Sequence, residues 1–346
     1  MNKSTRRLPA EWEPQDAVLL AWPHADTDWA PTLDDALDCY INIVRAAIPH
    51  VPLVIVSPEA TRLDDIFRPL DPSGRRVICR NIPTNDTWAR DFGPITVEDA
   101  GGMLPLDFTF NGWGLKFAAD RDNLITQRLD AGGLFARRPE SRRAMVLEGG
   151  AVESDGRGTI LTTSQCLLSP NRNPWMSRTD IERAFADAFG ATRVLWLDHG
   201  HLAGDDTDSH IDTLARFAPD DTILYVAPPE YPDDEHYSDL CAMEQQLRTF
   251  TTAEGNPYNL IALPMADPVY SPDGERLPAT YANFLVTNGA VLVPSYGSPR
   301  KDRLAADMLR IAYPGHTVHQ VDCRALIVQH GSLHCVTMQL PAATLS

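Results

Sequence analysis

The chain has 346 residues, 43% of them hydrophobic, and its 47 acidic against 30 basic residues give a formal net charge of −17. This acidity argues against a nucleic-acid partner, because phosphate binding needs a basic patch. It mildly favours a cationic substrate through long-range attraction, although solubility explains it equally well. The sequence has no apolar run of the roughly 20 residues that a membrane-spanning helix needs, and its N-terminus lacks the apolar core of a secretory signal. We therefore expect a cytoplasmic protein with no membrane partner.

The predicted elements alternate between short strands and amphipathic helices. In chain order they are a strand at 52–56, a helix at 58–67, strands at 77–81 and 159–163, a helix from Ser177 to Gly190, strands at 194–197 and 222–227, a helix at 236–250, a strand at 259–263, strands at 284–287 and 290–294 around Asn288-Gly289, a helix at 304–313, and strands at 317–321 and 334–339. Ser177 is a typical N-cap, Gly190 a typical helix stop, and Asn-Gly a strong hairpin signal. This pattern predicts a mixed α/β chain rather than a purely parallel sheet. With no linker in sight, we expect a single domain over 1–346.

Polar residues that suit catalysis end several of the strand-like runs, at intervals of 52 to 73 residues: Asp91, Glu148, His210, Asn283 and Cys335. Such spacing would suit repeated modules that each deliver one group to a shared centre. Taken singly, these residues have ordinary explanations. Asp91 could pair with its neighbour Arg90 on a solvated loop, and Glu148, before two glycines, could be a plain acid at a strand end.

The segment 198–212 (DHGHLAGDDTDSHID) supports two chemical interpretations. As a metal site it offers His199, His201, His210 and several carboxylates. As a general-base site it offers His210 and Asp212, which share one face if the chain is extended. An acidic loop with partly buried histidines is the third, unreactive interpretation.

Six cysteines lie far apart, at 39, 79, 166, 241, 323 and 335, with no Cys-x-x-Cys pair, which argues against a structural zinc site. We expect free thiols, and an inert buried thiol is the usual fate of each. Cys335 stands out because glycine precedes it in QHGSLHCVTMQLP (329–341), where it is predicted to begin a strand. On such a strand His334 points to the opposite face. The base for the thiol should then come from elsewhere, and His210 is the best candidate.

Together these segments resemble the agmatine deiminase family, which is related to the bacterial peptidylarginine deiminases. The similarity runs nearly end to end. It is carried by LPAEWEP at 8–14, LAWP at 20–23, NDTWARDFGP at 85–94, FNGWG at 110–114, LEGGAVESDGRGTILTT at 147–163, CLLSPNRNP at 166–174, GDDTDSHID at 204–212, YANF at 281–284 and GSLHCVTMQLP at 331–341.

The resemblance implies the pentein fold, an α/β propeller of five ββαβ-type modules with pseudo-fivefold symmetry around a central active site. It makes Cys335 the nucleophile, His210 the general acid/base, and Asp91, Glu148 and Asp212 the carboxylates around a guanidinium group. Carboxylates suit this role because a guanidinium is planar, always charged and rich in N–H donors.

The resemblance further implies hydrolysis of agmatine to N-carbamoylputrescine and ammonia, within polyamine metabolism, through an amidino-cysteine intermediate. Substrate contacts are expected from four further residues: Asp86, Trp88, Trp113 and Asn283. No metal or other cofactor is expected, the partner is a small cationic guanidine, and a homodimer is the assembly we allow for.

Two departures from the family pattern leave the substrate open. Ser209 and Asp208 stand where relatives carry Gly and Asn in DTNGHID, and FNGWGLKF replaces the commoner FNAWGG. Peptidyl arginine or another alkylguanidine is the alternative substrate, and amidino transfer to an amine uses the same intermediate. A zinc hydrolase built on 198–212 and a catalytically inactive binding protein are the alternatives from other classes.

Overall fold

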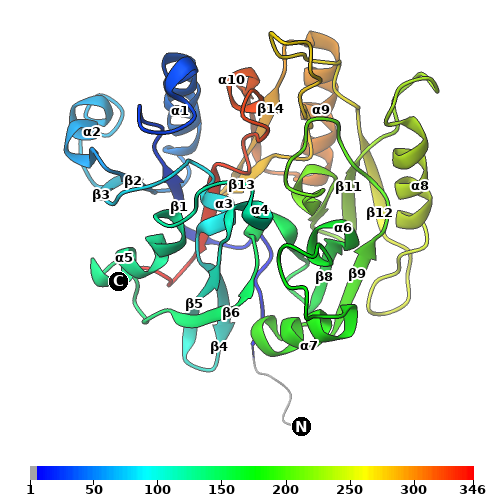
Figure 1. The fold of residues 1–346 in the computed structure, drawn as a ribbon, viewed down its shortest axis with the longest axis horizontal. Coiled ribbons are helices and arrows are strands. Elements are labelled where there is room, and N and C mark those ends of the chain that lie inside the picture. Colours follow the sequence, from blue (N-terminus) through cyan, green and yellow to red (C-terminus); the bar gives the residue numbers. More distant parts are fainter. Residues whose placement is uncertain (1–5) are drawn as a thin grey trace.

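The computed structural model describes residues 6–346, and their strands form five separate sheets. The expected mixed α/β architecture is confirmed. Figure 1 shows the sheets placed around the middle of the molecule, with the longer helices α1, α2, α7, α8 and α9 at its periphery. No helix of the described part is both long enough and apolar enough to cross a membrane.

The sheets share one pattern of strand pairing. Four of them are β4-β5-β6 (Ile95–Asp99, Gly102–Thr109, Glu140–Val146), β7-β8-β9 (Glu153–Ser154, Thr159–Thr163, Arg193–Leu197), β10-β11-β12 (Ala215–Ala218, Thr222–Val226, Asn259–Leu263) and β13-β14-β15 (Leu285–Thr287, Ala290–Ser295, Thr317–Asp322). In each, the middle strand pairs antiparallel with the strand before it and parallel with the strand after it. An antiparallel step needs only a tight turn, whereas a parallel step needs a longer crossover.

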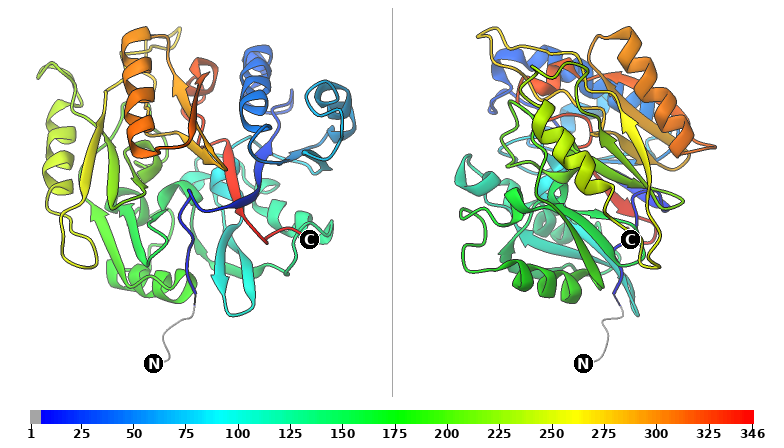
Figure 2. Two further views of the ribbon diagram at one scale, coloured as in Figure 1. Left: turned by 180° about the vertical axis from the view of Figure 1, so that it is seen from behind. Right: turned by 90° about the vertical axis from the view of Figure 1, so that its right-hand side faces the viewer.

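The fifth sheet joins the two ends of the described chain. Its order is β16-β1-β2-β3 (Thr337–Pro341, Gln15–Ala21, Leu53–Ser57, Val77–Asn81). β1 pairs antiparallel with β16, from Gln15 opposite Pro341 to Leu20 opposite Thr337. Figure 2 shows these two strands side by side. The last strand of the sequence therefore takes the place that the earliest strand takes in each of the other sheets.

Four of the helices were predicted, and α1 and the shorter helices were not. Their bounds are α1 (Leu33–Ala47), α2 (Ala60–Phe67), α3 (Ala89–Phe92), α4 (Gly112–Leu115), α5 (Ile125–Ala131), α6 (Ser164–Leu167), α7 (Arg178–Phe189), α8 (Tyr237–Leu247), α9 (Pro299–Ala312) and α10 (Arg324–Ile327). Ser177 caps α7 through a reciprocal box with Asp180. The predicted start of α9, at 304, is five residues too late, because Pro299 occupies the first turn, where its missing N–H costs nothing.

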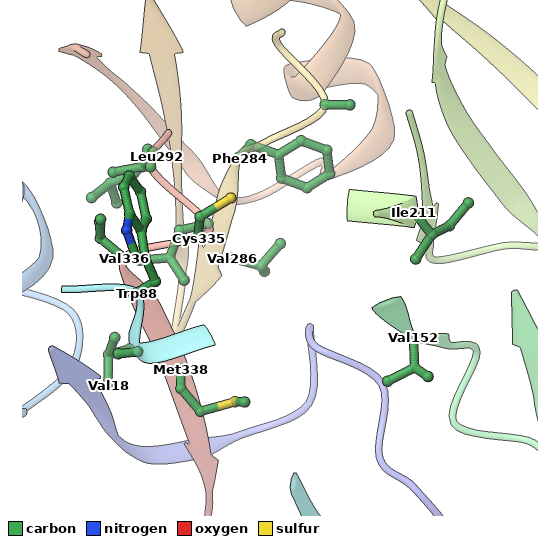
Figure 3. Packing of buried hydrophobic residues seen from close by; sticks show 14 of the residues in the cluster. Val18, Trp88, Val152, Ile211, Phe284, Val286, Leu292, Cys335, Val336 and Met338 are labelled. Atoms are coloured by element: carbon green, nitrogen blue, oxygen red, sulfur yellow. The ribbon is translucent and has the colours of Figure 1, made fainter. Parts of the chain in front are cut away.

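The last predicted strand is wrong at its start. β16 begins at Thr337, and Cys335 lies in a turn over residues 333–336. The side chain of Asn283 imposes this turn, because its Oδ1 accepts the backbone N–H groups of His334 (2.9 Å) and Cys335 (3.3 Å). Figure 3 shows Cys335 among buried apolar side chains that include Trp88 and Val336.

Candidate active site

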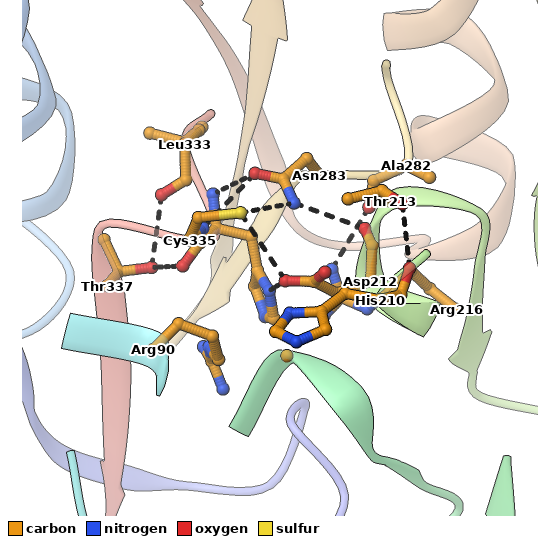
Figure 4. Close-up of polar contacts among 12 residues, drawn as sticks. Arg90, His210, Asp212, Thr213, Arg216, Ala282, Asn283, Leu333, Cys335 and Thr337 are labelled. Carbon is orange, nitrogen blue, oxygen red and sulfur yellow. Dashed lines mark hydrogen bonds and ion pairs between the residues drawn. The ribbon is translucent and has the colours of Figure 1, made fainter. Parts of the chain in front are cut away.

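The sulfur of Cys335 is held by two polar groups in the turn that precedes β16 (Figure 4). Asn283 Nδ2 donates to Sγ at 3.2 Å, and the thiol donates to Asp212 Oδ2 at 3.8 Å. The residue is only 4% exposed. Burial, followed by the negative charges of Asp212 and Asp91, raises the pKa of the Cys335 thiol well above its usual value. The thiol form is therefore favoured, and a positive charge beside the sulfur would favour its ionisation.

Two carboxylates and an imidazole converge beside this thiol. Gly150 marks the place: a Cβ built there would lie 2.6 Å from His210 Nδ1, 2.9 Å from Asp91 Oδ1 and 3.1 Å from Asp212 Oδ2. The chain needs glycine at this position because any side chain would collide with those atoms. The sequence predicted these three groups for one site, and the fold brings them together.

Asp91 lies in the short helix α3, within the segment NDTWARDFGP. Its Oδ2 accepts the indole N–H of Trp113 at 2.9 Å, and its Oδ1 lies 3.6 Å from His210 Nδ1. Burial raises the pKa of Asp91 to about 6, against the opposing effect of His210. This carboxylate is therefore ionised near neutral pH and has little hydration to lose when a cation binds.

His210 is completely buried at the N-terminal end of the short 3-10 helix η4 (Ile211–Thr213). Within the described chain, neither of its ring nitrogens has a hydrogen-bond partner. Burial alone would lower the pKa of His210, but Asp91, Cys166 and Glu148 together raise it well above its usual value. The surrounding negative groups thus favour the imidazolium form of the ring.

Glu148 is already paired. Its two carboxylate oxygens accept the Nε–H of Arg172 at 2.8 and 3.1 Å, and both side chains are completely buried. Arg172 also reaches Asp208 Oδ2 at 2.5 Å. Sequence reasoning placed Glu148 on the substrate and did not predict Arg172, although this arginine lies in the CLLSPNRNP segment of the family resemblance.

A second buried network lies behind Cys335. His334 Nδ1 contacts Asp212 Oδ2 at 2.7 Å, and its Nε2 contacts Glu11 Oε1 at 2.9 Å. Glu11 also forms ion pairs with Arg90, at 2.9 Å, and with Arg216. The sequence analysis placed His334 on the opposite face of a strand from Cys335, but both residues lie in a turn. The His334 ring and the Cys335 thiol both contact Asp212 Oδ2. Glu11, in the LPAEWEP segment, had no local signal that marked it.

The pocket in front of Cys335 is acidic and aromatic. It encloses roughly 410 Å³, counting its open mouth, and its walls include three aromatic rings and four carboxylates: Trp88, Trp113, Phe117, Asp28, Asp86, Asp91 and Asp206. Among the described residues that line it, none is lysine or arginine. Burial raises the pKa of Asp86 to about 6, and burial also raises the pKa of Asp206. Such a pocket suits a slender molecule with positive charge.

The expected substrate contacts divide into two groups. Asp86, Trp88 and Trp113 line the pocket. Trp88 packs flat on the backbone of Gly331, where a Cβ would lie 2.1 Å from the ring. Asn283, in contrast, contacts the sulfur and the turn that carries it, so the structure places it as a support for Cys335.

The histidines of 198–212 do not gather at one metal site. His199 and His201 are about half exposed and face Asp239 of α8, with Nδ1 at 3.6 and 3.1 Å from its carboxylate oxygens. His210 is buried beside Asp91 instead. The zinc-hydrolase hypothesis needed these three rings together and is contradicted in that form.

Both departures from the family pattern occupy strained backbone. Asp208 and Ser209 have φ of 64° and 62°, and Leu115, in the FNGWGLKF segment, has φ of 69°. Glycine tolerates this left-handed region, whereas other residues are strained there. Ion pairs from Asp208 to Arg172 and to Lys116 (2.9 Å to its Nζ) hold the first of these positions. The residues that differ from the family pattern therefore strain the backbone near the pocket. They leave Asp91, His210 and Cys335 in place.

Fold and site together define a class: a mixed α/β protein with a buried thiol, an imidazolium and carboxylates at the end of a pocket for a cation. The chain belongs to the Porphyromonas-type peptidyl-arginine deiminase family, whose model matches residues 7–341. It is 31% identical to the agmatine deiminase of Pseudomonas aeruginosa over 97% of this chain and 95% of that protein.

Two solved structures extend the comparison. One, from Porphyromonas gingivalis and provisionally described as an arginine deiminase, is 52% identical, with a TM-score of 0.92 over 99% of this chain and 100% of that chain. The other, a cysteine-to-serine variant of C. jejuni agmatine deiminase with substrate bound, is 35% identical, with a TM-score of 0.88 over 97% and 96%.

Proposed function

We propose that this protein is an agmatine deiminase, which hydrolyses the guanidinium group of agmatine to N-carbamoylputrescine and ammonia. The observation that carries the proposal is the convergence of the Cys335 thiol, His210, Asp91 and Asp212 at the end of an acidic pocket. A guanidinium carbon presented to the sulfur would have carboxylates at hand for its N–H groups. The named activity of relatives such as the Pseudomonas aeruginosa enzyme supports the same chemistry.

The charge of the pocket favours agmatine over free arginine. Agmatine carries a guanidinium at one end and an ammonium at the other, and the pocket supplies Asp91 near the sulfur with Asp28, Asp86 and Asp206 along its walls. The α-carboxylate of free arginine would face these acids with no lysine or arginine of the lining to balance it. Like charges in a partly buried site are costly, so arginine should bind poorly.

In the first half of the mechanism, the bound guanidinium lets Cys335 ionise. Its positive charge offsets those of Asp91 and Asp212, which raise the pKa of the thiol in the empty site. The thiol gives up its proton to solvent through the open mouth of the pocket, and the resulting thiolate attacks the guanidinium carbon and forms a C–S bond. His210, held as an imidazolium beside Asp91, gives its proton to a terminal nitrogen, and the C–N bond breaks to release ammonia.

The second half is hydrolysis of the amidino-cysteine. His210, now neutral, takes a proton from water, which attacks the same carbon. The C–S bond breaks, the thiol is regenerated, and the ureido product leaves. Asn283, whose Nδ2 donates to the sulfur at 3.2 Å, keeps it aligned in both halves.

Deimination of peptidyl arginine is the second candidate, because the matching family model carries that description. A peptide has neutral amides where agmatine has an ammonium, so it would leave part of the acidic lining unpaired. An assay for ureido products with agmatine, free arginine and a peptide with internal arginine tests the choice. We expect kcat/KM for agmatine to exceed the others by about 100-fold or more, equivalent to about 3 kcal/mol. A higher value for the peptide would overturn the assignment of agmatine.

We further propose that residues 1–346 form one catalytic domain with the pentein arrangement, a five-module propeller with the active site at its centre. The common strand pattern of the five sheets and the pairing of β1 with β16 support this proposal. The cytoplasmic location and the homodimer stay predictions, which cell fractionation and sedimentation would test.

A further inference from the structure

A second thiol, that of Cys166, lies close to the imidazole of His210. Cys166, Glu148 and His210 each offer one donor atom, and these atoms all lie within 4.8 Å of one another. The three side chains are completely buried. The mechanism described above makes no use of Cys166.

These donors match what Zn²⁺ takes from proteins: a thiolate, an imidazole nitrogen and a carboxylate oxygen. In a tetrahedral zinc site, bond lengths of 2.0 to 2.3 Å place neighbouring donors roughly 3.3–3.6 Å apart. The present separations, at most 4.8 Å, would close to that value by shifts of about an ångström in side chains that already face one another. The fourth position would remain for water.

The imidazole of His210 has ring nitrogens available to bind a metal ion. Both ring nitrogens of His210 lack a hydrogen-bond partner within the described chain, although the ring is completely buried. A buried polar group without a partner is uncommon, and a catalytic role or a bound ion would account for it. The substrate would account for one ring nitrogen during turnover, and a metal ion held by Cys166 and Glu148 would account for the other.

The backbone around the site is fixed in advance. Thr163 Oγ1 accepts the backbone N–H of Cys166 at 3.3 Å and donates to the carbonyl of Ser209 at 2.8 Å. One hydroxyl therefore ties the start of α6 to the residue that precedes His210. A site whose ligands are held by such supporting contacts binds metal without reorganising the chain.

The local charge permits a divalent ion. Arg172 is the nearby cation, and it is already neutralised by Glu148 and Asp208, at 2.8 and 2.5 Å. Asp91 adds a further negative charge 3.6 Å from His210. Zinc binding would release the thiol proton of Cys166 and one ring proton of His210, and would leave a thiolate and an imidazole nitrogen as ligands.

We propose that Glu148, Cys166 and His210 form an inhibitory Zn²⁺ site. Zinc bound there ties up the nitrogen lone pair of His210, so the ring can no longer carry protons between the leaving ammonia and water. The inhibition rests on the proposed deiminase function, whereas metal binding does not.

Cobalt(II), which replaces zinc in such sites, gives the most direct test because a cobalt–thiolate bond absorbs in the near ultraviolet. We expect the purified enzyme and its Cys335→Ser variant to develop this band with one equivalent of Co²⁺, and Cys166→Ser to lack it. Cys241→Ser, on α8 away from the site, is the matched control and should keep the band. A band that is lost in Cys335→Ser and kept in Cys166→Ser would overturn the proposal and assign the metal to the nucleophile.

X-ray absorption of the zinc-loaded, unmodified enzyme covers the case in which Cys166→Ser fails to fold. One sulfur among nitrogen and oxygen ligands is expected, and a shell without sulfur would contradict the site. In assays, Cys166→Ser should raise the Zn²⁺ concentration for half-inhibition about tenfold or more, with inhibition of the unmodified enzyme reversed by a chelator. Equal zinc sensitivity of the two proteins would overturn the inhibitory role. Because the cobalt band needs no turnover, it still tests the site if the deiminase assignment fails.

Discussion

Oδ2 of Asp212 lies 3.8 Å from Sγ of Cys335 and accepts a hydrogen bond from His334 at 2.7 Å. The same carboxylate thus depresses the acidity of the thiol in the empty site and is available to a cationic substrate. Loss of the Asp212 charge should therefore increase the reactivity of the thiol and decrease the rate of turnover, two quantities that usually change in the same direction.

Asp212→Asn should change these two quantities in opposite directions. Loss of the negative charge lowers the pKa of Cys335, so iodoacetamide should alkylate the thiol faster at neutral pH. Turnover should fall about 100-fold or more, because one carboxylate of a buried cation site is gone. Stopped alkylation with mass detection and a steady-state ammonia assay measure the two effects. Slower alkylation would show that Asp212 does not act on the thiol through its charge.

The pH profile should have an acid limb near pH 6. Burial raises the pKa of Asp86 and Asp91 to about 6, and each carboxyl loses its attraction for a cation when protonated. kcat/KM should therefore rise as pH increases through about 6, and should fall as pH drops below it. Initial rates at low agmatine concentration between about pH 5 and pH 9 give the profile. A kcat/KM that stays flat down to pH 5 would contradict the assigned roles of these acids.

Glu148→Gln should lower the free energy of unfolding as well as the rate of turnover. The substitution leaves the guanidinium of Arg172 buried with a neutral partner on that side, which typically costs about 3–5 kcal/mol. The double variant Glu148→Gln/Arg172→Met should recover part of the free energy of unfolding without recovering activity. Denaturant unfolding with a parallel ammonia assay distinguishes the two losses. Full recovery of kcat/KM in the double variant would show that Glu148 serves only to pair with Arg172.

Ser209→Gly should stabilise the fold by about 1 kcal/mol. The residue has φ of 62°, its hydroxyl is buried without a partner within the described chain, and its backbone N–H keeps its bond to Asp205 in either variant. Ser209→Ala is the matched control, because it removes the hydroxyl and keeps the strained Cβ. If alanine stabilised as much as glycine, the hydroxyl and not the backbone would be the source of the cost.

Strong local signals predicted local structure, whereas β1, α1 and the sheet β4-β5-β6 were not predicted. The helix after Ser177 and the hairpin at Asn288-Gly289 lie where capping and turn chemistry put them. The strand predicted at Cys335 was wrong because its turn depends on the side chain of Asn283, 52 residues away. Apolar alternation in QHGSLHCVTMQLP contains no information about that distant amide.

The sequence predicted those site residues that stand out within their own segments. Asp91, His210 and Cys335 were predicted in this way, and the fold places them near one another. The partners of these residues could not be read from the sequence, since Arg172 meets Glu148 across 24 residues and Glu11 meets His334 across 323. Such pairs arise only when the sheets assemble, and a buried arginine or glutamate looks like a surface residue in the sequence.

The central claim is that Cys335 forms a covalent bond to the guanidinium carbon. Acid quenching during turnover of agmatine, followed by peptide mass analysis, tests it most directly. The account predicts that the peptide containing Cys335 gains the mass of agmatine less ammonia, and that Cys335→Ser gains nothing and releases no ammonia. Ammonia release by Cys335→Ser at an appreciable rate, or the same mass gain on another cysteine, would contradict it.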